Sequence, residues 1–252
     1  MLTPAEWHSR FNHQSQWTKE IRTKFFRYYG VNRESKLLEV GCGTGAVIAE
    51  LMNDFPACYF GIDNQYERLA YAHSLHPDLA YSKANGEFLP FKSNIFDGVF
   101  CHFLLLWIKN PVRVIKEMVK ITRPGGFVAA FAEPDYGGRI DHPASLIELG
   151  RLQTESLKIQ GADPEIGRKV AGLFYSAGLI NIQVGIFGAW WQSSYSNEAF
   201  ESEWKILESD LSETVSKQKL AQFKKIDYTS RKKGERILYV PTFFAAGEVP
   251  ND

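Results

Sequence analysis

Three glycines in one short segment are the clearest chemical signal in this sequence. The segment is Leu37-Leu38-Glu39-Val40-Gly41-Cys42-Gly43-Thr44-Gly45, and it lies between a predicted strand and a predicted helix. Glycines permit a tight turn there and let the backbone approach a ligand without interference from Cβ atoms. The helix that follows begins with free N–H groups that can bind a polar group. The segment therefore predicts a ligand-binding loop.

Two carboxylates near this loop narrow the class of ligand. Glu39 stands two residues before the first glycine, where a carboxylate suits an ammonium or sulfonium better than a pyrophosphate. Asp63 lies about twenty residues further on, at the end of the second predicted strand, where an acidic group accepts hydrogen bonds from ribose hydroxyls. Asp63 predicts a nucleoside but does not choose between cofactors. Gly41, Gly43 and Ala46 also match the dinucleotide pattern, so an NAD-dependent oxidoreductase remains an alternative.

Short apolar runs alternate with amphipathic stretches over most of the chain, and this pattern predicts the elements that position these residues. Strands joined by helices at such spacing form βαβ units and a mostly parallel sheet. An amphipathic stripe before Gly30 predicts an N-terminal helix that begins at Thr3-Pro4. The strands are expected at residues 37–40, 59–62, 80–82, 96–101, 127–132, 180–186 and 237–244, and further helices at 46–53, 66–73, from 111, 144–159 and 165–177.

The glycine segment, read together with later motifs, resembles the class I S-adenosylmethionine-dependent methyltransferases. Leu38 through Gly45 is similar to the first motif of that family, and Asp63 stands where the family places its ribose-binding acid. The match continues in register over residues 36–133 through Asn85-Gly86-Glu87-Phe88-Leu89-Pro90-Phe91, Phe96-Asp97-Gly98-Val99-Phe100, Asn110-Pro111, Glu117-Met118 and Arg123-Pro124-Gly125-Gly126.

The resemblance implies a Rossmann-like sheet of seven mostly parallel strands with helices on both faces. It also implies S-adenosylmethionine as the cofactor and a methyltransferase that acts on a small-molecule acceptor. Cofactor contacts are expected from the N-terminal helix, the glycine loop and the strand ends: Trp17, Thr18, Glu39, Gly41, Cys42, Gly43, Gly45, Asp63, Asn64, Asn85, Gly86, Glu87 and Cys101.

One position departs from the family pattern. Asp commonly occupies the place of Asn85 and contacts the adenine, but an Asn side-chain oxygen can also accept a hydrogen bond from the adenine amino group. The alternative for Asn85 is a plain turn residue in an Asn-Gly pair.

The acceptor is expected beyond the carboxyl ends of the parallel strands. His102, after the fourth predicted strand, is a candidate catalytic base, and the alternative is a histidine that is only packed at the strand end. Candidate acceptor contacts besides His102 are Glu133, Asp135, Tyr136, Trp190 and Trp191. Turn formation and helix capping are the alternative for the first three, and packing of an insertion is the alternative for the two tryptophans.

One domain over residues 1–252 accounts for the whole pattern. Residues 1–30 are expected to form a helical lid, with simple packing against the main body as the alternative, and residues 36–133 the cofactor-binding half. Residues 134–162 and 187–235 are expected as insertions on the acceptor side. A basic stretch from Lys217 to Lys233 indicates the exposed face of a helix, and contact with a phosphate-bearing acceptor is the alternative.

Composition limits the partners and the location. The 29 basic and 29 acidic side chains balance, which argues against a nucleic-acid binder because such proteins need a basic face. Three cysteines without metal-ligand spacing, and histidines without a carboxylate partner pattern, predict reduced thiols and no metal site. The polar N-terminus and the lack of a run of about 20 apolar residues predict no membrane partner and a cytoplasmic location. A cofactor-binding regulatory protein without catalysis is a further alternative.

Overall fold

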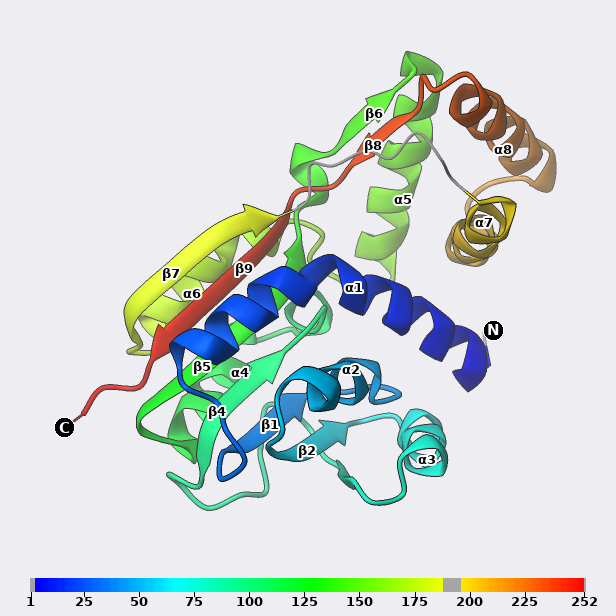
Figure 1. Cartoon of the computed structure of the whole chain (residues 1–252). Helices are drawn as coiled ribbons and strands as arrows, with labels where there is room; N and C mark the ends of the chain where they lie inside the picture. The colour runs from blue at the N-terminus through cyan, green and yellow to red at the C-terminus, as the bar shows by residue number, and fades with distance from the viewer. Residues whose placement is uncertain (1–2, 188–195, 252) are drawn as a thin grey trace.

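A seven-stranded sheet forms the centre of the computed structural model, which describes residues 3–187 and 196–251 (Figure 1). The strand order is β3-β2-β1-β4-β5-β9-β7. Neighbours among the first five strands are parallel, whereas β9 is antiparallel to both β5 and β7. The bounds are β1 (Lys36–Val40), β2 (Cys58–Asp63), β3 (Ala80–Lys83), β4 (Phe96–Cys101), β5 (Thr122–Pro134), β7 (Ile180–Phe187) and β9 (Thr242–Glu248). This arrangement confirms the predicted mostly parallel sheet.

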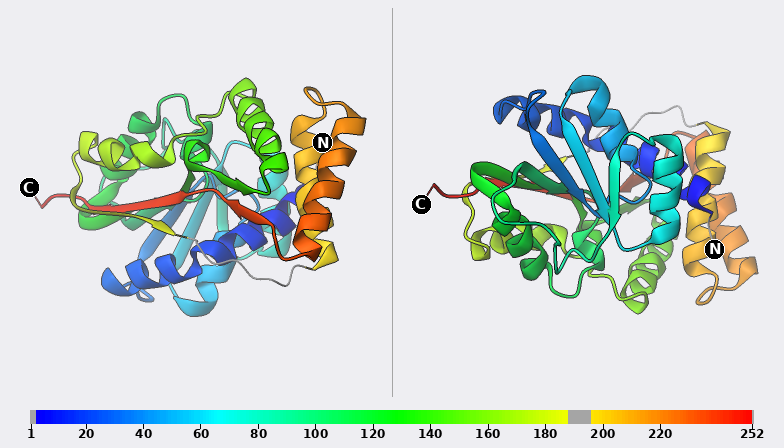
Figure 2. Two further views of the ribbon diagram at one scale, coloured as in Figure 1. Left: turned by 90° about the horizontal axis from the view of Figure 1, so that it is seen from above. Right: turned by 90° about the horizontal axis from the view of Figure 1, so that it is seen from below.

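Helices cover both faces of the sheet (Figure 2). One face packs against α1 (Pro4–Tyr28), α2 (Ala46–Asp54) and α3 (Tyr66–Leu75), and the other against α4 (Pro111–Ile121) and α6 (Val170–Ser176). Neighbouring residues of a strand point to opposite faces, so Leu37 contributes to the first core and Leu38 to the second. Both side chains are completely buried.

Helix α1 is continuous and carries two kinds of buried side chain. It begins with a capping box, in which the Glu6 backbone N–H donates to Thr3 Oγ1 and the Glu6 carboxylate accepts from the Thr3 backbone N–H. Phe25 and Phe26 near its end pack into an aromatic core with the sheet. The earlier turns bury the polar residues Gln14, Ser15, Thr18 and Arg22. These four side chains lie at the end of the sheet where the parallel strands terminate.

The remaining elements pack together as one unit, which we call the cap. It consists of β6 (Ile140–His142), α5 (Ile147–Ile159), α7 (Asn197–Leu211), α8 (Lys217–Lys232) and β8 (Ile237–Tyr239), with β6 and β8 paired antiparallel. The chain enters the cap after β5 and leaves it after α5 toward α6, then enters it again after β7 and leaves it after β8 into β9. The cap therefore lies beyond the carboxyl ends of the parallel strands (Figure 1). The two predicted insertions thus contact each other.

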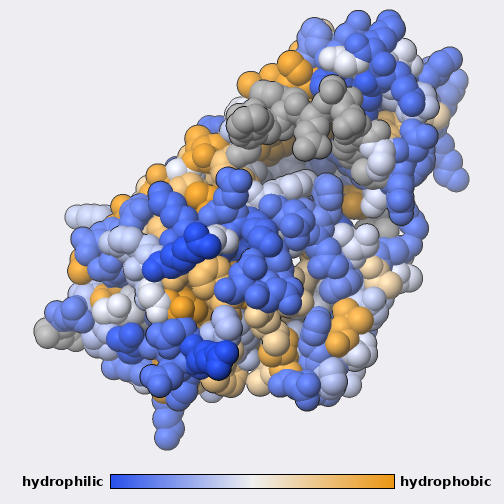
Figure 3. Space-filling model, viewed as in Figure 1, coloured by the Kyte–Doolittle hydropathy of each residue, from blue (hydrophilic) through white to orange (hydrophobic). Residues whose placement is uncertain are grey.

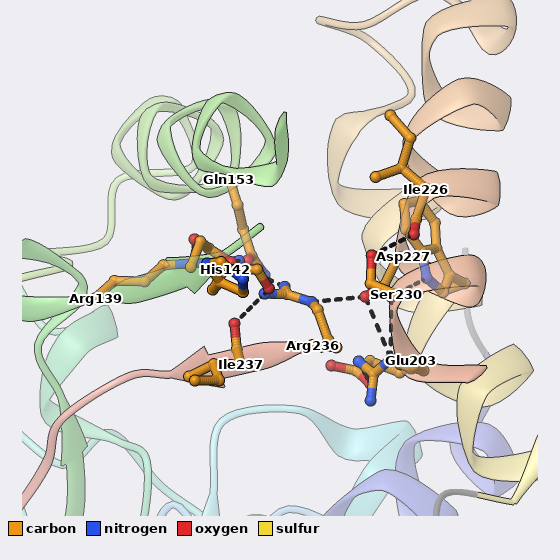
Figure 4. Close-up of polar contacts among 12 residues, drawn as sticks. Arg139, His142, Gln153, Glu203, Ile226, Asp227, Ser230, Arg236 and Ile237 are labelled. Carbon is orange, nitrogen blue, oxygen red and sulfur yellow. Dashed lines mark hydrogen bonds and ion pairs between the residues drawn. The ribbon is translucent and has the colours of Figure 1, made fainter. Parts of the chain in front are cut away.

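The cap has its own apolar core and its own buried ion-pair network. The core includes Leu149, Trp204 and Phe223. Arg236 donates from Nε to Asp227 Oδ1 at 2.7 Å and from Nη2 to Asp141 Oδ1 at 2.8 Å, and all three side chains are about 4% exposed or less (Figure 4). The outer end of the cap, where α8 lies, is mostly hydrophilic (Figure 3), as predicted for its basic stretch.

The structure differs from the sequence prediction at three elements. The strand expected at 237–244 is two strands, β8 and β9, in two different sheets, because the chain passes from the cap to the central sheet at Val240-Pro241. The helix expected at 165–177 begins only at Val170, after a 3₁₀ turn at Gly167–Lys169. Strand β5 is longer than 127–132 at both ends. Further 3₁₀ turns lie at Leu105–Trp107 (η1), Tyr136–Gly138 (η2) and Ala144–Leu146 (η3).

None of the helices in the described part of the chain combines the length and apolar character needed to cross a bilayer.

Candidate functional site

The glycine loop connects β1 to α2 and is held closely by neighbouring side chains. The backbone N–H groups of Gly41 and Cys42 both donate to the Ile62 carbonyl, at 2.8 and 2.9 Å. Gly43 has φ +53°, and a Cβ there would lie 2.8 Å from the ring of Phe11 in α1. A larger residue at Gly43 would therefore be strained in conformation and would collide with α1. The loop and the N-terminal half of α1 fit together as one surface.

Asp63 ties the glycine loop to the start of α3. Its Oδ2 accepts from the Gly43 backbone N–H at 2.9 Å, and its Oδ1 accepts from the Gln65 backbone N–H at 2.8 Å. Each carboxylate oxygen has a second lone pair, so the buried Asp63 can also accept from two hydroxyls of a ligand. Asn64, which follows it, is exposed to solvent.

Glu39 is a buried carboxyl group with an unsatisfied oxygen. The residue is 2% exposed, and Oε2 has no hydrogen-bond partner. Burial raises its pKa to about 8, against the opposing field of the Arg22 guanidinium. A buried acceptor without a donor at the end of β1 is what a ligand ammonium would satisfy, so the residues present fit the cofactor that the sequence implies.

The segment after β3 forms a local turn. Asn85 Oδ1 accepts from the Glu87 backbone N–H at 2.9 Å, and Asn85 itself is exposed. One acceptor lone pair of the Asn85 side chain is thus used within the turn, and one remains. Gly86 packs against Val40 of β1, since a Cβ on Gly86 would lie 3.2 Å from that side chain. Both alternatives for Asn85 are therefore compatible with its geometry.

The end of β4 brings Cys101 and His102 toward α1 and β5. Cys101 is completely buried, and burial raises the pKa of its thiol. His102 Nε2 lies 3.0 Å from Thr18 Oγ1. Burial, together with the charge of Arg22, holds the pKa of His102 well below its usual value of 6.5. His102 is therefore neutral, which is the form a base requires.

Glu133 at the end of β5 contacts the backbone of η1. Its Oε1 accepts from the N–H groups of Leu104 and Leu105 at 3.2 and 2.9 Å, and its Oε2 accepts from that of Leu106 at 3.2 Å. The sequence predicted an acceptor contact here. The geometry instead gives both oxygens to the loop that follows β4, so Glu133 positions this loop.

Asp135 and Tyr136 follow Glu133 but differ in surroundings. Asp135 accepts both an Nε and an Nη2 hydrogen bond from Arg168, at 2.6 and 2.8 Å, and caps η2 through the Gly137 backbone N–H. This capping is the alternative role that the sequence left open. The partly buried phenol of Tyr136 faces the charged groups of α1 and the cap, and burial raises its pKa. Trp190 and Trp191 lie outside the described residues.

The structure separates Trp17 from its neighbour Thr18. Thr18 is completely buried beside His102, whereas Trp17 is 52% exposed and meets the edge of the Phe103 ring at a centroid distance of 6.3 Å. Successive helix residues point about 100° apart, so only one of the two can face inward. Trp17 therefore lies at the border of the site.

Sequence reasoning missed Arg22 and Glu50. Arg22 is 1% exposed and its Nη2 donates to Glu50 Oε2 of α2 at 2.5 Å. The sequence did contain a signal, because Gln14, Thr18 and Arg22 recur every four residues on one face of a helix. A charged side chain is seldom fully buried unless it is paired, and its partner lies 28 positions away.

Comparison with known sequences finds similarity to methyltransferases. Residues 38–130 match the model of a methyltransferase domain. The chain is 27% identical over 125 residues to a malonyl-[acyl-carrier protein] O-methyltransferase of Marinomonas sp., covering 47% of this chain and 45% of that relative. It is 31% identical over 104 residues to a demethylmenaquinone methyltransferase of Renibacterium salmoninarum, covering 40% and 44%. The chain thus spans about half the length of the curated relatives it matches.

Solved structures show the same fold. A phosphoethanolamine N-methyltransferase 2 of Haemonchus contortus, in complex with phosphomonomethylethanolamine and S-adenosylhomocysteine, superposes with a TM-score of 0.59 at 16% identity. The match covers 90% of this chain and 51% of that chain. It therefore includes the cap as well as the sheet.

Proposed function

We propose that this chain, whose residues 38–130 match the model of a methyltransferase domain, is a class I S-adenosylmethionine-dependent methyltransferase that transfers a methyl group from S-adenosylmethionine to a small-molecule acceptor. The observation that carries the proposal is the buried, unpartnered Oε2 of Glu39 beside the glycine loop. A buried polar atom without a partner is unusual in a protein interior unless a ligand satisfies it. The ammonium of the cofactor provides such a donor.

Each part of the cofactor has residues suited to it. The second lone pairs of Asp63 accept from the two ribose hydroxyls, and Glu39 accepts from the ammonium. The remaining lone pair of Asn85 Oδ1 is available to the adenine amino group. When bound, the cofactor supplies a methyl group activated by the positive charge of its sulfur.

The chain itself aligns the acceptor and excludes water, which is most of what this in-line displacement requires. The N-terminal half of α1 covers the glycine loop through Phe11. The same end of α1 contacts the cap through an ion pair between Glu6 and Lys205. His102 lies where the acceptor must approach and is the residue we propose as the base for an acceptor that loses a proton.

The acceptor class rests on charge and on position. The relatives named above act on malonyl-[acyl-carrier protein] and on demethylmenaquinone. Related chains thus methylate acceptors of unrelated chemistry, and the relatives do not specify the acceptor of this chain. A net charge of zero favours a small acceptor over a nucleic acid. The cytoplasmic location stays a prediction, in keeping with the three free thiols Cys42, Cys58 and Cys101.

Isothermal titration with S-adenosylhomocysteine tests the cofactor site. We expect micromolar affinity, and a loss of about 100-fold in Asp63→Ala, since two buried hydrogen bonds contribute about 1–3 kcal/mol each. Asp78→Ala is the matched control, because Asp78 is exposed after α3 and should leave the affinity unchanged. A folded wild-type protein that binds no cofactor, or that is stabilised by NADH instead, would contradict the proposal.

Methyl transfer from radiolabelled cofactor to a panel of small hydroxy, amino and carboxylic acids tests the acceptor. Transfer to a panel member supports the enzyme. Binding of cofactor without transfer to any small molecule or protein fraction would support the regulatory alternative.

A further inference from the structure

We infer that Arg10, Gln14 and Tyr136 form a site for a carboxylate group of the acceptor. The first two residues belong to α1 and the third to η2, so the site lies where the N-terminal helix meets the chain that leads into the cap. The inference rests on the proposed function and deepens it, because it names the chemical class of the small molecule that this end of the sheet receives.

The position of Arg10 and Gln14 follows from one face of α1. Residues four apart in a helix lie one above the other, so these two side chains continue the row that includes Thr18. Thr18 Oγ1 lies 3.0 Å from His102 Nε2 at the end of β4. Each step of four residues advances about 6 Å along the helix axis. The row therefore leads from the end of β4 toward the end of α1 that contacts the cap (Figure 1).

Gln14 is a polar side chain that is buried without a partner. It is 8% exposed, and no hydrogen bond joins its amide to any residue that the structure describes. The amide is nevertheless not among the fully enclosed atoms that lack a partner, so it borders space that solvent reaches. A polar group in such a place is normally satisfied by water or by a ligand. Gln14 therefore marks a position where a ligand can accept or donate a hydrogen bond.

Arg10 supplies a cation whose N–H groups are unused. Its guanidinium carbon lies 5.8 Å from the centre of the Trp7 ring, and such a cation–π contact leaves the N–H donors available. Over residues 3–187 and 196–251, no carboxylate forms an ion pair or a hydrogen bond with Arg10. A carboxylate of a ligand can therefore pair with this guanidinium through two parallel hydrogen bonds.

Tyr136 places a hydroxyl near Arg10. Its backbone N–H donates to the Pro164 carbonyl at 2.8 Å, and its hydroxyl has no hydrogen-bond partner in the described part of the chain. Burial raises the pKa of the phenol, and the charge of Arg10 opposes this increase. The side chain is also partly exposed. A group that is closely surrounded and still reached by solvent lies in a concave part of the surface, so a ligand can reach this hydroxyl.

The second cation near Tyr136 is already used. Arg139 donates from Nε and Nη2 to the two carboxylate oxygens of Asp141, at 2.6 and 3.2 Å. It also donates from Nη1 to Gln153 at 2.5 Å. The charge of Arg139 is thus balanced within the cap, and Arg10 is the cation left for a ligand.

Two acidic residues of α7 limit the charge of that ligand. Asp210 and Glu203 both act on the phenol of Tyr136 with the sign opposite to that of Arg10. Burial raises the pKa of Asp210, and Arg10 opposes this increase without forming an ion pair. One unused guanidinium beside two carboxyl groups suits a ligand with a single negative charge, whereas a dianion such as a phosphate would be repelled. The planar carboxylate also matches the fork of a guanidinium.

The site lies at a distance from His102. A carboxylate between Arg10 and Gln14 is one to two helical turns, or about 6–12 Å along α1, from Thr18. His102 marks the reacting end of the acceptor in the proposed function. The methyl group therefore goes to an atom other than the bound carboxylate, and the acceptor is an elongated monocarboxylic acid.

Isothermal titration of the full chain with benzoate tests the site. Benzoate is the probe for a carboxylate, benzamide has a similar shape without the charge, and phenyl phosphate is the dianion. We expect saturable binding of benzoate and weaker binding of both other probes. Benzoate that does not bind up to about 20 mM, that binds no better than benzamide, or that binds less tightly than phenyl phosphate would overturn the inference.

A parallel titration with S-adenosylhomocysteine separates this inference from the proposed function. If S-adenosylhomocysteine binds and benzoate does not, the carboxylate site fails and the proposed function stands. If benzoate binds and S-adenosylhomocysteine does not, the proposed function fails and the site for an anion stands.

A pair of substitutions in α1 tests whether Arg10 carries the binding. Arg10→Met keeps most of the length and removes the charge, and we expect a loss of about tenfold or more in benzoate affinity, because hydrogen bonds to charged groups are strong. Arg27→Met, at an exposed position of the same helix, is the matched control and should leave the affinity unchanged. An unchanged affinity in Arg10→Met that is folded by circular dichroism would overturn the inference.

Gln14→Glu gives a second readout that does not depend on the folding of Arg10→Met. It keeps the shape and places a carboxylate where the carboxylate of the ligand is expected. We expect benzoate affinity to fall well below that of benzamide, while affinity for S-adenosylhomocysteine stays unchanged. A purely structural role of Gln14 would lower the affinities for benzoate and benzamide together, and that result would overturn the inference.

Discussion

The cofactor half and the cap treat their buried polar groups differently. In the part of the chain that the structure describes, four buried side-chain atoms have no hydrogen-bond partner, and they belong to Arg22, Tyr29, Glu39 and Tyr81. Arg22 lies in α1, Tyr29 directly follows that helix, and Glu39 and Tyr81 lie in the cofactor half. In the cap, by contrast, Asp227 accepts from Trp204 as well as from Arg236. A satisfied network stabilises a fold, whereas an unsatisfied one is available to a ligand.

The two regions also differ in how far apart in sequence their partners lie. Asp63 contacts a glycine 20 positions away, and both belong to one βαβ unit. Arg236 contacts Asp141 across 95 positions. The comparison teaches that the binding loop is encoded locally, while the cap depends on two distant segments that meet. Four substitutions can break or sharpen this contrast.

Asp227→Ala should have the largest effect, on the stability of the cap. It leaves the buried Arg236 with one carboxylate instead of two and the Trp204 N–H without an acceptor. We expect a loss of about 3–5 kcal/mol in the free energy of unfolding, measured by urea denaturation. Glu213→Ala, at an exposed position between α7 and α8, is the control. Affinity for S-adenosylhomocysteine should stay within twofold, and a large loss would mean that the regions are not separable.

Glu133→Gln should destabilise the junction of the two regions by about 2 kcal/mol. Above pH 8, where Glu133 is ionised, both of its oxygens accept from backbone N–H groups, whereas a Gln amide has one acceptor oxygen and its NH₂ group would face an N–H of η1. The loss is therefore expected at pH 9 and should be smaller at pH 6. Thermal unfolding and hydrogen exchange at residues 104–106 measure this. Glu155→Gln on the exposed face of α5 is the control. If Glu133→Gln leaves the stability unchanged, Glu133 does not position this loop and is again a candidate contact of the methyl acceptor.

Glu39→Gln should reduce the pH dependence of stability in the cofactor half. Because the folded pKa of Glu39 is about 8 and its ordinary value is 4.5, the unfolded state releases this proton first. Stability is therefore lost as pH rises from about 4.5 through 8, by up to about 1.4 kcal/mol per pH unit. The raised pKa of Glu133 also makes stability fall as pH rises. Glu39→Gln should therefore keep the contribution of Glu133 to this pH dependence and lose that of Glu39. Identical slopes of unfolding free energy against pH from 5 to 9 would show that Glu39 is not buried as described.

Lys219→Ala should have the smallest effect, although it breaks an ion pair of the cap. Lys219 of α8 and Glu148 of α5 are 42% and 46% exposed, and exposed pairs contribute about 0.5 kcal/mol or less. Urea denaturation should place this variant near wild type. A loss approaching that of Asp227→Ala would mean that the surface of the cap, and not its buried network, holds it together.

The sequence by itself determined the cofactor half. The glycine loop, Asp63 and the alternation of strands with helices follow from backbone conformation and from short-range periodicity, and both are properties of neighbouring residues. The family resemblance rested on the same segments. For this reason the seven-stranded sheet agreed with its prediction. The residues expected around the glycine loop lie at the ends of the strands of this sheet.

Only the tertiary structure decided the rest. Whether Thr18 or Trp17 faced inward and which atoms Glu133 contacted depended on how α1 and η1 pack against the sheet. The single strand expected at 237–244 became two for a similar reason, because the cap offers β8 a partner in β6. Such contacts join residues far apart in the chain, and their geometry is set by packing rather than by any local pattern.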